Sequence, residues 1–111
     1  MLKELGYQWE NLVKLHYQKQ WFQLLSQNYT IPGGEIDLIF GKENTIVFVE
    51  VKVVDGVDDI FNYLSQKKLK ALWRAIHTYC MRPFVQCDDV QLDVVFVKWW
   101  KIREVYDAIE L

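Results

Sequence analysis

Hydrophobic residues in the first quarter of the chain recur with the period of an α-helix. Across residues 3–27 one face collects Leu5, Trp9, Leu12, Val13, His16 and Leu24. This spacing predicts one amphipathic helix over the range. Glu10 lies about 100° from Trp9 around that helix, at the border of the apolar face. From this position its carboxylate can reach the rim of the core, but the helix alone favours the alternative, an ordinary solvated glutamate.

The pattern then changes to the two-residue period of β-strands. Residues 28–31 predict a short first strand, which Pro32 and the glycine pair at 33–34 end. Residues 35–40 predict a second strand with two different faces. One face carries Ile36, Leu38 and Phe40, and the other carries Glu35, Asp37 and Ile39.

A polar turn at residues 41–44 leads into a third strand at residues 45–53. Both of its faces are largely apolar, which is typical of a central strand covered on both sides. Ile46, Phe48, Glu50 and Lys52 share one face. Charged side chains such as Asp37, Glu50 and Lys52 are costly in strands of this kind unless they are paired or bind a metal. This cost points to a function.

An acidic loop at residues 54–59 separates the third strand from a second helix, for which Ser65 is the expected N-cap and 82–83 the end. Two lysines near its start are not equivalent. On a helical wheel Lys68 lies within about 40° of the sheet-facing Leu72, whereas Lys67 points away. Lys68 is therefore the one expected to face a site beside the sheet; the alternative is that it extends along the helix start to water.

Two more strands complete the chain. Residues 90–100 alternate as a buried strand, and residues 101–109 predict an edge-like return strand or turn. The predicted class is α/β, with a central mixed β-sheet flanked by helices in the order α-β-β-β-α-β-β. Residues 1–111 are expected to form a single domain.

Composition narrows the function classes. The chain has 111 residues and a net charge of -2, so it offers no global attraction for nucleic acid or anionic membrane. No apolar run approaches the roughly 20 residues of a membrane span, and the N-terminus lacks the apolar core of a signal peptide. We expect a cytoplasmic protein with no membrane partner. The spacing of Cys80 and Cys87 permits a disulfide, but two buried thiols are favoured.

The charged residues of the second and third strands form the pattern D-x12-E-x-K. Neighbouring strands lie about 4.8 Å apart, so Asp37 and Glu50 can share a divalent ion, and oxygen ligands suit Mg²⁺ or Mn²⁺. Lys52 can hold a water or neutralise charge on a phosphate. Glu10 can bind a water of that ion or a second metal, and Lys68 can add a phosphate contact. The alternative is a surface hairpin with a Glu–Lys pair.

Five segments carry a resemblance to a known family. They read GYQWE (6–10), GGEIDLI (33–39), VFVEVK (47–52), SQKKLKAL (65–72) and LDVVFV (92–97). On these segments the chain resembles the YraN-like endonuclease family, within the PD-(D/E)xK restriction-endonuclease-like superfamily, to which Holliday junction resolvase-like proteins belong. The pairing of GEIDLI with FVEVK, in this order and with this gap, is the most specific part.

The resemblance implies a restriction-endonuclease-like core and a metal-dependent phosphodiesterase site at one edge of the sheet. Asp37 matches the metal-binding aspartate of the motif, and Glu50 and Lys52 match its ExK. Glu10 matches the acidic residue of the first helix, and Lys68 the lysine at the start of the second. The implied cofactor is Mg²⁺ or Mn²⁺, and the implied partner is nucleic acid, with DNA expected.

The chain departs from the family pattern where the family carries basic residues. Ile31 and Pro32 precede GGEID, Val54 stands two residues after Lys52, and Gln91 and Leu92 precede the DVV segment. Each missing arginine removes one potential phosphate contact. The pattern therefore predicts an intact metal site with fewer cations around it.

Three functions fit these residues. The first is a Mg²⁺-dependent nuclease in which Asp37 and Glu50 hold the metal. The second is a non-catalytic module that binds nucleic acid or a DNA junction through the remaining basic residues: Lys67, Lys68, Lys70, Arg74, Arg82, Lys98, Lys101 and Arg103. The third is a protein-interaction adaptor on the same fold, for which a homodimer is one expected form.

Overall fold

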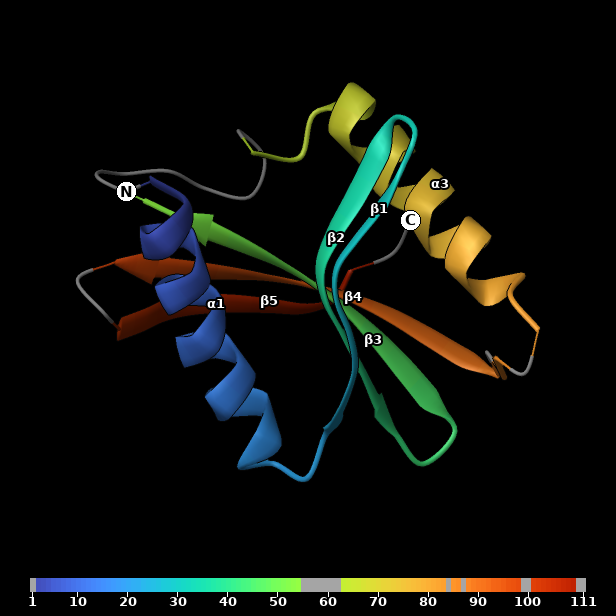
Figure 1. Ribbon diagram of the computed structural model, residues 1–111, viewed down its shortest axis with the longest axis horizontal. Coiled ribbons are helices and arrows are strands. Elements are labelled where there is room, and N and C mark those ends of the chain that lie inside the picture. Colours follow the sequence, from blue (N-terminus) through green and yellow to red (C-terminus); the bar gives the residue numbers. More distant parts are fainter. Residues whose placement is uncertain (1, 55–62, 84, 87, 99–100, 110–111) are drawn as a thin grey trace.

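The computed structural model describes residues 2–54, 63–83, 85–86, 88–98 and 101–109, without the side chains of residues 2–7, 103–104 and 106–109. Within these ranges the chain forms two helices and five strands (Figure 1). In chain order they are α1 (Leu2–Gln18), β1 (Gln23–Ile31), β2 (Gly34–Lys42), β3 (Thr45–Val53), α3 (Gln66–Cys80), β4 (Asp89–Lys98) and β5 (Lys101–Ile109).

The five strands form one mixed sheet in the order β1-β2-β3-β4-β5. Pairing is antiparallel except between β3 and β4, which run parallel. A parallel pair needs a long crossover, and the segment that contains α3 supplies it. The predicted α/β class, with its mixed sheet and its order α-β-β-β-α-β-β, is confirmed.

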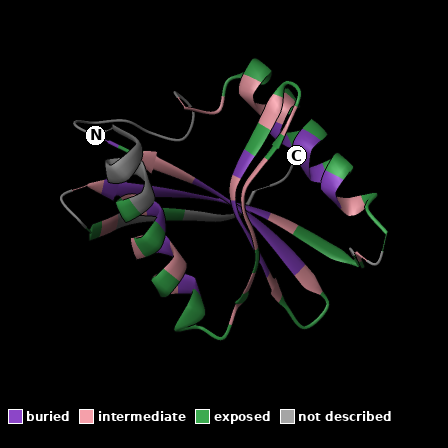
Figure 2. Cartoon of the chain, in the orientation of Figure 1, coloured by how far each residue is buried: buried purple, intermediate pink, exposed green. Residues whose placement is uncertain are grey.

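Helices α1 and α3 cover opposite faces of the sheet. On β3, Val47 and Val49 pack in the cluster that contains Val13 of α1, whereas Ile46 and Phe48 pack in the cluster of α3. Buried positions follow the central strands and the inward side of α3 (Figure 2). The expectation that β3 is covered on both faces is confirmed.

The predicted first helix is too long. Helix α1 ends at Gln18, and β1 already begins at Gln23. The chain turns between them at Trp21, whose φ of 70° is incompatible with a continuing right-handed helix. Leu24 matched the helical period, but it belongs to a strand that pairs with Phe40. Periodicity alone cannot separate the end of a helix from a strand that directly follows it.

The face assignment in β2 is wrong at one position. Leu38 and Phe40 pack on the α1 side as expected, but Ile36 packs on the α3 side. The β2–β3 ladder stops at the pair of Leu38 with Val49. In the paired strand β1, Asn28 has a φ of 54°. The β1–β2 hairpin bends in this region, and the alternation of faces is interrupted between Ile36 and Leu38. Figure 1 shows this bend.

The second helix begins as predicted. Ser65 is the N-cap of α3, and its Oγ accepts a hydrogen bond from the backbone N–H of Lys68 at 3.2 Å. The helix ends at Cys80, two residues before the expected end. Residues 55–62, most of the predicted acidic loop, lie outside the described residues. In the described part of the chain, no helix is both long and apolar enough to cross a membrane.

The expectation of free thiols is wrong for Cys80, which is disulfide-bonded. The chain has one other cysteine, Cys87, which lies outside the described residues. Spacing in the sequence does not decide between a thiol and a disulfide, because that depends on how the chain folds back after the helix.

Candidate active site

The site begins where β2 separates from β3. Beyond Leu38 the two strands no longer form a backbone ladder, and the side chain of Asp37 takes over one of its bonds. Its Oδ2 accepts a hydrogen bond from the backbone N–H of Val51 at 2.8 Å. The gap that the separating strands leave is thus filled by a carboxylate.

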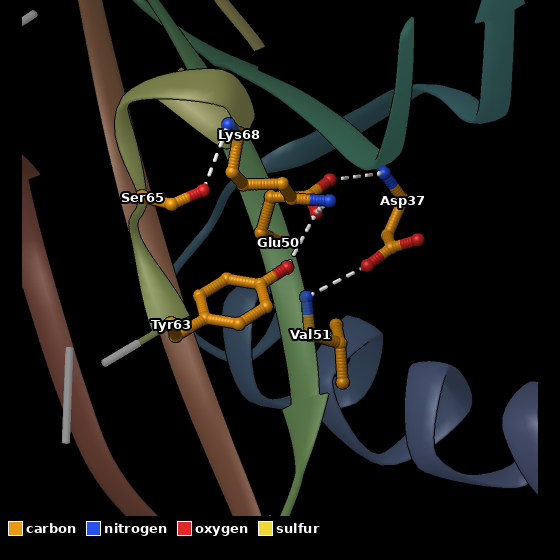
Figure 3. Close-up of polar contacts among 6 residues, drawn as sticks. All are labelled: Asp37, Glu50, Val51, Tyr63, Ser65 and Lys68. Atoms are coloured by element: carbon orange, nitrogen blue, oxygen red, sulfur yellow. Dashed lines mark hydrogen bonds and ion pairs between the residues drawn. The ribbon is translucent and has the colours of Figure 1, made fainter. Parts of the chain in front are cut away.

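Glu50 of β3 lies beside Asp37 and is only 3% exposed. Its Oε1 accepts a hydrogen bond from the backbone N–H of Asp37 at 3.2 Å. Its Oε2 accepts a hydrogen bond from the hydroxyl of Tyr63 at 3.0 Å and lies 3.2 Å from the ammonium of Lys68. Figure 3 shows the Glu50 carboxylate between Asp37 on one side and Tyr63 and Lys68 on the other.

Glu10 reaches this region from α1. It is 9% exposed, and its Oε1 is buried without a hydrogen-bond partner among the described residues. Burial, followed by the charges of Asp37 and Glu35, raises the pKa of Glu10 to about 7. A buried carboxylate oxygen with no partner is costly. The ordinary solvated glutamate that the helix alone favoured is therefore wrong, because Glu10 lies at the rim of the core.

The pKa values of the two central carboxylates are raised as well. Burial and the neighbouring charge of Glu50 raise the pKa of Asp37, although the hydrogen bond from Val51 opposes the shift. Burial also raises the pKa of Glu50, against the charge of Lys68. Two carboxylates in a poorly solvated space repel one another, so this end of the hairpin favours an added proton or cation.

Tyr63 connects the lysines to the carboxylates. The ammonium groups of Lys52 and Lys68 lie 5.3 Å and 5.4 Å from the centre of its ring. Burial and the charge of Glu50 raise the pKa of Tyr63, which keeps its hydroxyl protonated and able to donate. Its ring also meets Phe96 of β4 edge to face. Tyr63 therefore contacts both lysines through its ring and Glu50 through its hydroxyl.

A family model for the uncharacterised protein family UPF0102 matches residues 9–97, which is most of the chain. The chain belongs to this family. The family is that of YraN-like proteins, so the resemblance seen in the sequence is confirmed. The matched range contains every residue of the site, from Glu10 to Lys68.

Several UPF0102 proteins align with this chain, two of them over most of its length. A UPF0102 protein of Carboxydothermus hydrogenoformans is 29% identical over 98 residues, which cover 86% of this chain and 83% of that protein. One of Methylocella silvestris is 33% identical over 92 residues, covering 81% and 74%. A UPF0102 protein of Vibrio parahaemolyticus is 52% identical over only 50 residues, 45% of this chain and 41% of the relative. Their names state the family and no activity.

The five site residues predicted for this UPF0102 chain lie at one end of the β2–β3 hairpin. Asp37, Glu50 and Lys68 are joined by direct contacts, and Lys52 joins them through the ring of Tyr63. Glu10 lies close enough to Asp37 for the charge of Asp37 to raise the pKa of Glu10. Lys68 faces the site while Lys67 is exposed, as the helical wheel predicted.

Tyr63 was missed. It falls in a stretch after the acidic loop with no periodic pattern, and sequence spacing does not show that this stretch lies near Glu50. The signal was its place two residues before the Ser65 cap. A residue there lies just before α3, whose first turn carries Lys68.

The donor set suits a hard divalent cation. Glu10, Asp37 and Glu50 offer only carboxylate oxygens, and the buried Oε1 of Glu10 lacks a partner. The carboxylates are not gathered into a cage, however. Among the described residues, no three His, Cys, Asp or Glu side chains are close enough together to hold a metal ion. Binding by Asp37 and Glu50 remains a prediction, and it requires Glu50 to turn from Lys68.

Proposed function

We propose that this UPF0102 protein is a metal-dependent nuclease that hydrolyses phosphodiester bonds in nucleic acid, with DNA as the expected substrate. One observation carries the proposal: burial and neighbouring carboxylates raise the pKa of Glu10 and Asp37 at one end of a hairpin. Crowded, buried carboxylates destabilise a fold unless a cation or a proton neutralises them. Perturbed carboxylates beside lysines are typical of functional sites.

Each residue has a role in this proposal. Asp37 and Glu50 would hold Mg²⁺ or Mn²⁺, which supplies a Lewis acid and a more acidic water. Glu10, with a pKa of about 7, is suited to take a proton from the attacking water at neutral pH. Lys52 would stabilise the charge that develops on the phosphate oxygens. Lys68 pairs with Glu50 when no metal competes and would turn to the phosphate when one does.

A non-catalytic nucleic-acid-binding module is the second candidate. The observation that favours it is the ion pair of Glu50 with Lys68, at 3.2 Å, which occupies a carboxylate oxygen that a metal would need. In such a module the carboxylates would only position lysines. Binding would then persist in EDTA, and Asp37→Ala would leave it unchanged.

The deciding experiment measures cleavage of branched, single-stranded and duplex DNA and of RNA, with Mg²⁺, with Mn²⁺ and in EDTA. We expect cleavage of at least one substrate by the wild-type protein with metal, and its loss in Lys52→Ala. Lys19→Ala is the matched control, because Lys19 is an exposed lysine in the turn after α1. It should cleave at the wild-type rate.

Calorimetry with Mn²⁺ separates the outcomes. Metal binding that Asp37→Ala abolishes supports the nuclease. No cleavage of any substrate and no measurable binding of either ion would overturn it. Binding of nucleic acid in EDTA, without cleavage in metal, would leave the second candidate.

A further inference from the structure

Helix α3 has a second side, which points away from the sheet. Five of its exposed residues form what we call the α3 outer face: Lys67, Lys70, Trp73, Arg74 and His77. The helix carries four Lys and Arg residues and no Asp or Glu, although the whole chain has a net charge of -2. Positive charge is thus gathered on one helix of a mildly acidic protein, which favours an anionic partner there.

Flat rings accompany the charges. Trp73 is 52% exposed, and its ring lies 6.1 Å from that of His77 at an interplanar angle of 31°. A tryptophan and a histidine one turn apart therefore present a ring surface to solvent between cations. Proteins that bind single-stranded nucleic acid combine these two features, because bases stack on aromatic rings while cations contact the phosphates.

Arg74 ties this face to the hairpin that carries the site. A side chain added at Gly33, in the β1–β2 turn, would place its first carbon 2.6 Å from Nη1 of Arg74. The guanidinium therefore lies directly at Gly33, which is four residues before Asp37. Gly33 has a φ of 84° and leaves the space that Arg74 fills.

The α3 outer face also leads to the site along the helix. Lys67 lies on it, whereas the next residue, Lys68, faces Glu50. Trp73 is five residues further, or about 8 Å along the helix axis. A strand stacked on Trp73 would need only a few nucleotides to bring a phosphate to Lys68 and Glu50.

We propose that the α3 outer face binds single-stranded nucleic acid and guides it to the carboxylate site. Unpaired bases stack on Trp73 and His77, while Lys67, Lys70 and Arg74 contact phosphates. A duplex does not fit this role, because its bases are already stacked and closed to the rings. The guiding part rests on the proposed nuclease function; the binding part does not.

Fluorescence anisotropy tests the binding in EDTA, where no cleavage occurs. The probes are a fluorescein-labelled 15-nucleotide oligothymidine and a labelled duplex of the same length. We expect the single strand to bind about tenfold tighter than the duplex. Trp73→Ala should weaken single-strand binding by about 5- to 150-fold, the range found for the loss of one stacked base, and Trp73→Phe should retain most of it.

Trp21→Ala is the matched control, since Trp21 is 85% exposed but lies in the turn after α1. It should bind like the wild type. The triple variant Lys67→Ala, Lys70→Ala, Arg74→Ala should reduce the slope of log affinity against log salt by about 2. Circular dichroism confirms that each variant is folded.

Two results would overturn the inference: duplex binding as tight as single-strand binding, or equal effects of Trp73→Ala and Trp21→Ala. Neither depends on catalysis. If the single strand binds through Trp73 but nothing is cleaved with metal, the proposed nuclease function fails while the α3 outer face stands.

Discussion

Two buried carboxylates on neighbouring strands of this protein have opposite characters. Glu50 of β3 and Asp93 of β4 are each 3% exposed, and each accepts a hydrogen bond from a tyrosine hydroxyl. They lie on opposite faces of the sheet, because Asp93 is paired in register with Val49 and Glu50 with the residue after Asp93. Burial and a tyrosine partner therefore do not distinguish them.

The other groups around Glu50 and Asp93 distinguish the two carboxylates. Asp93 accepts from Tyr17 at 2.6 Å and from Gln91 at 2.8 Å, and the ring of Tyr17 stacks on Phe40 at 4.7 Å. Glu50 instead stands beside a second carboxylate, and burial raises the pKa of both. A buried carboxylate surrounded by donors stabilises the fold, whereas buried carboxylates crowded together indicate chemistry.

The largest expected effect is on activity, and it separates Asp37, the neighbour of Glu50, from Asp93. Asp37→Ala should lower cleavage with Mg²⁺ by about 100- to 1000-fold, because it removes a ligand of the catalytic ion. Asp93→Ala should leave the activity of the folded fraction unchanged. Rates per folded molecule, with the fraction folded measured by circular dichroism, provide the test. Equal losses in both variants would contradict the division.

Asp93 should matter for stability, although it does not matter for activity. Asp93→Ala leaves the buried hydroxyl of Tyr17 without its acceptor, so it should lower the free energy of unfolding by about 2–4 kcal/mol. Asp88→Ala, at an exposed position just before β4, should change it by less than about 0.5 kcal/mol. Urea denaturation measures both. A wild-type midpoint for Asp93→Ala would show that this carboxylate does not stabilise the fold.

The two tyrosines sharpen the contrast further. The hydrogen bond from Tyr63 lowers the pKa of Glu50, so Tyr63→Phe should move the acid limb of the pH–rate profile to higher pH. It should also cut kcat about fivefold, while the ring that contacts Lys52 and Lys68 remains. Tyr17→Phe should leave the profile unmoved and cost about 1–2 kcal/mol of stability. A shift in both profiles, or in neither, would remove the assigned role of Tyr63.

The smallest effect concerns Glu10 in the absence of metal. Its pKa is raised from 4.5 to about 7, so between these pH values the folded state retains a proton that the unfolded state releases. Stability should therefore fall as pH rises through this window. Glu10→Gln should flatten the decline and raise stability at pH 8 by about 1 kcal/mol. Urea denaturation in EDTA at pH 5 and pH 8 measures it.

Glu43→Gln, in the exposed β2–β3 turn, is the control for this experiment and should keep the wild-type pH dependence. Some dependence should also remain in Glu10→Gln, because the pKa of Asp37 is raised as well. If wild-type stability rose with pH across the window, the burial of Glu10 would not act as described.

The sequence predicted the buried strands best. In β3 and β4 the two-residue period is unbroken, and both faces are apolar, so their residues appear on the expected sides. The charged residues Asp37, Glu50 and Lys52 were recognisable because their neighbours in the strands are apolar. The wheel separated Lys68 from Lys67 for a similar reason, since a regular helix with a clear apolar stripe fixes directions.

The sequence failed where regularity stops. Trp21 and Asn28 adopt positive φ, and nothing in the pattern announces either turn of the backbone. The helix ends before Trp21, and Ile36, whose partner Tyr29 follows Asn28, packs on the other face from Leu38. Tyr63 was missed because it reaches Glu50 from a segment that only the folded chain brings near. Long-range contacts of irregular segments do not appear in a periodic pattern.

The hydrogen bond from the Val51 amide to Asp37 has a practical consequence. A backbone proton that points at a carboxylate senses its charge, so the amide resonance of Val51 in a nitrogen–proton correlation spectrum should move when Asp37 gains a proton or a cation. This reporter needs nitrogen-15 labelling of the protein but no dye, substrate or mutation. Spectroscopy could thus follow the ionisation of the site in the intact protein, one titration step at a time.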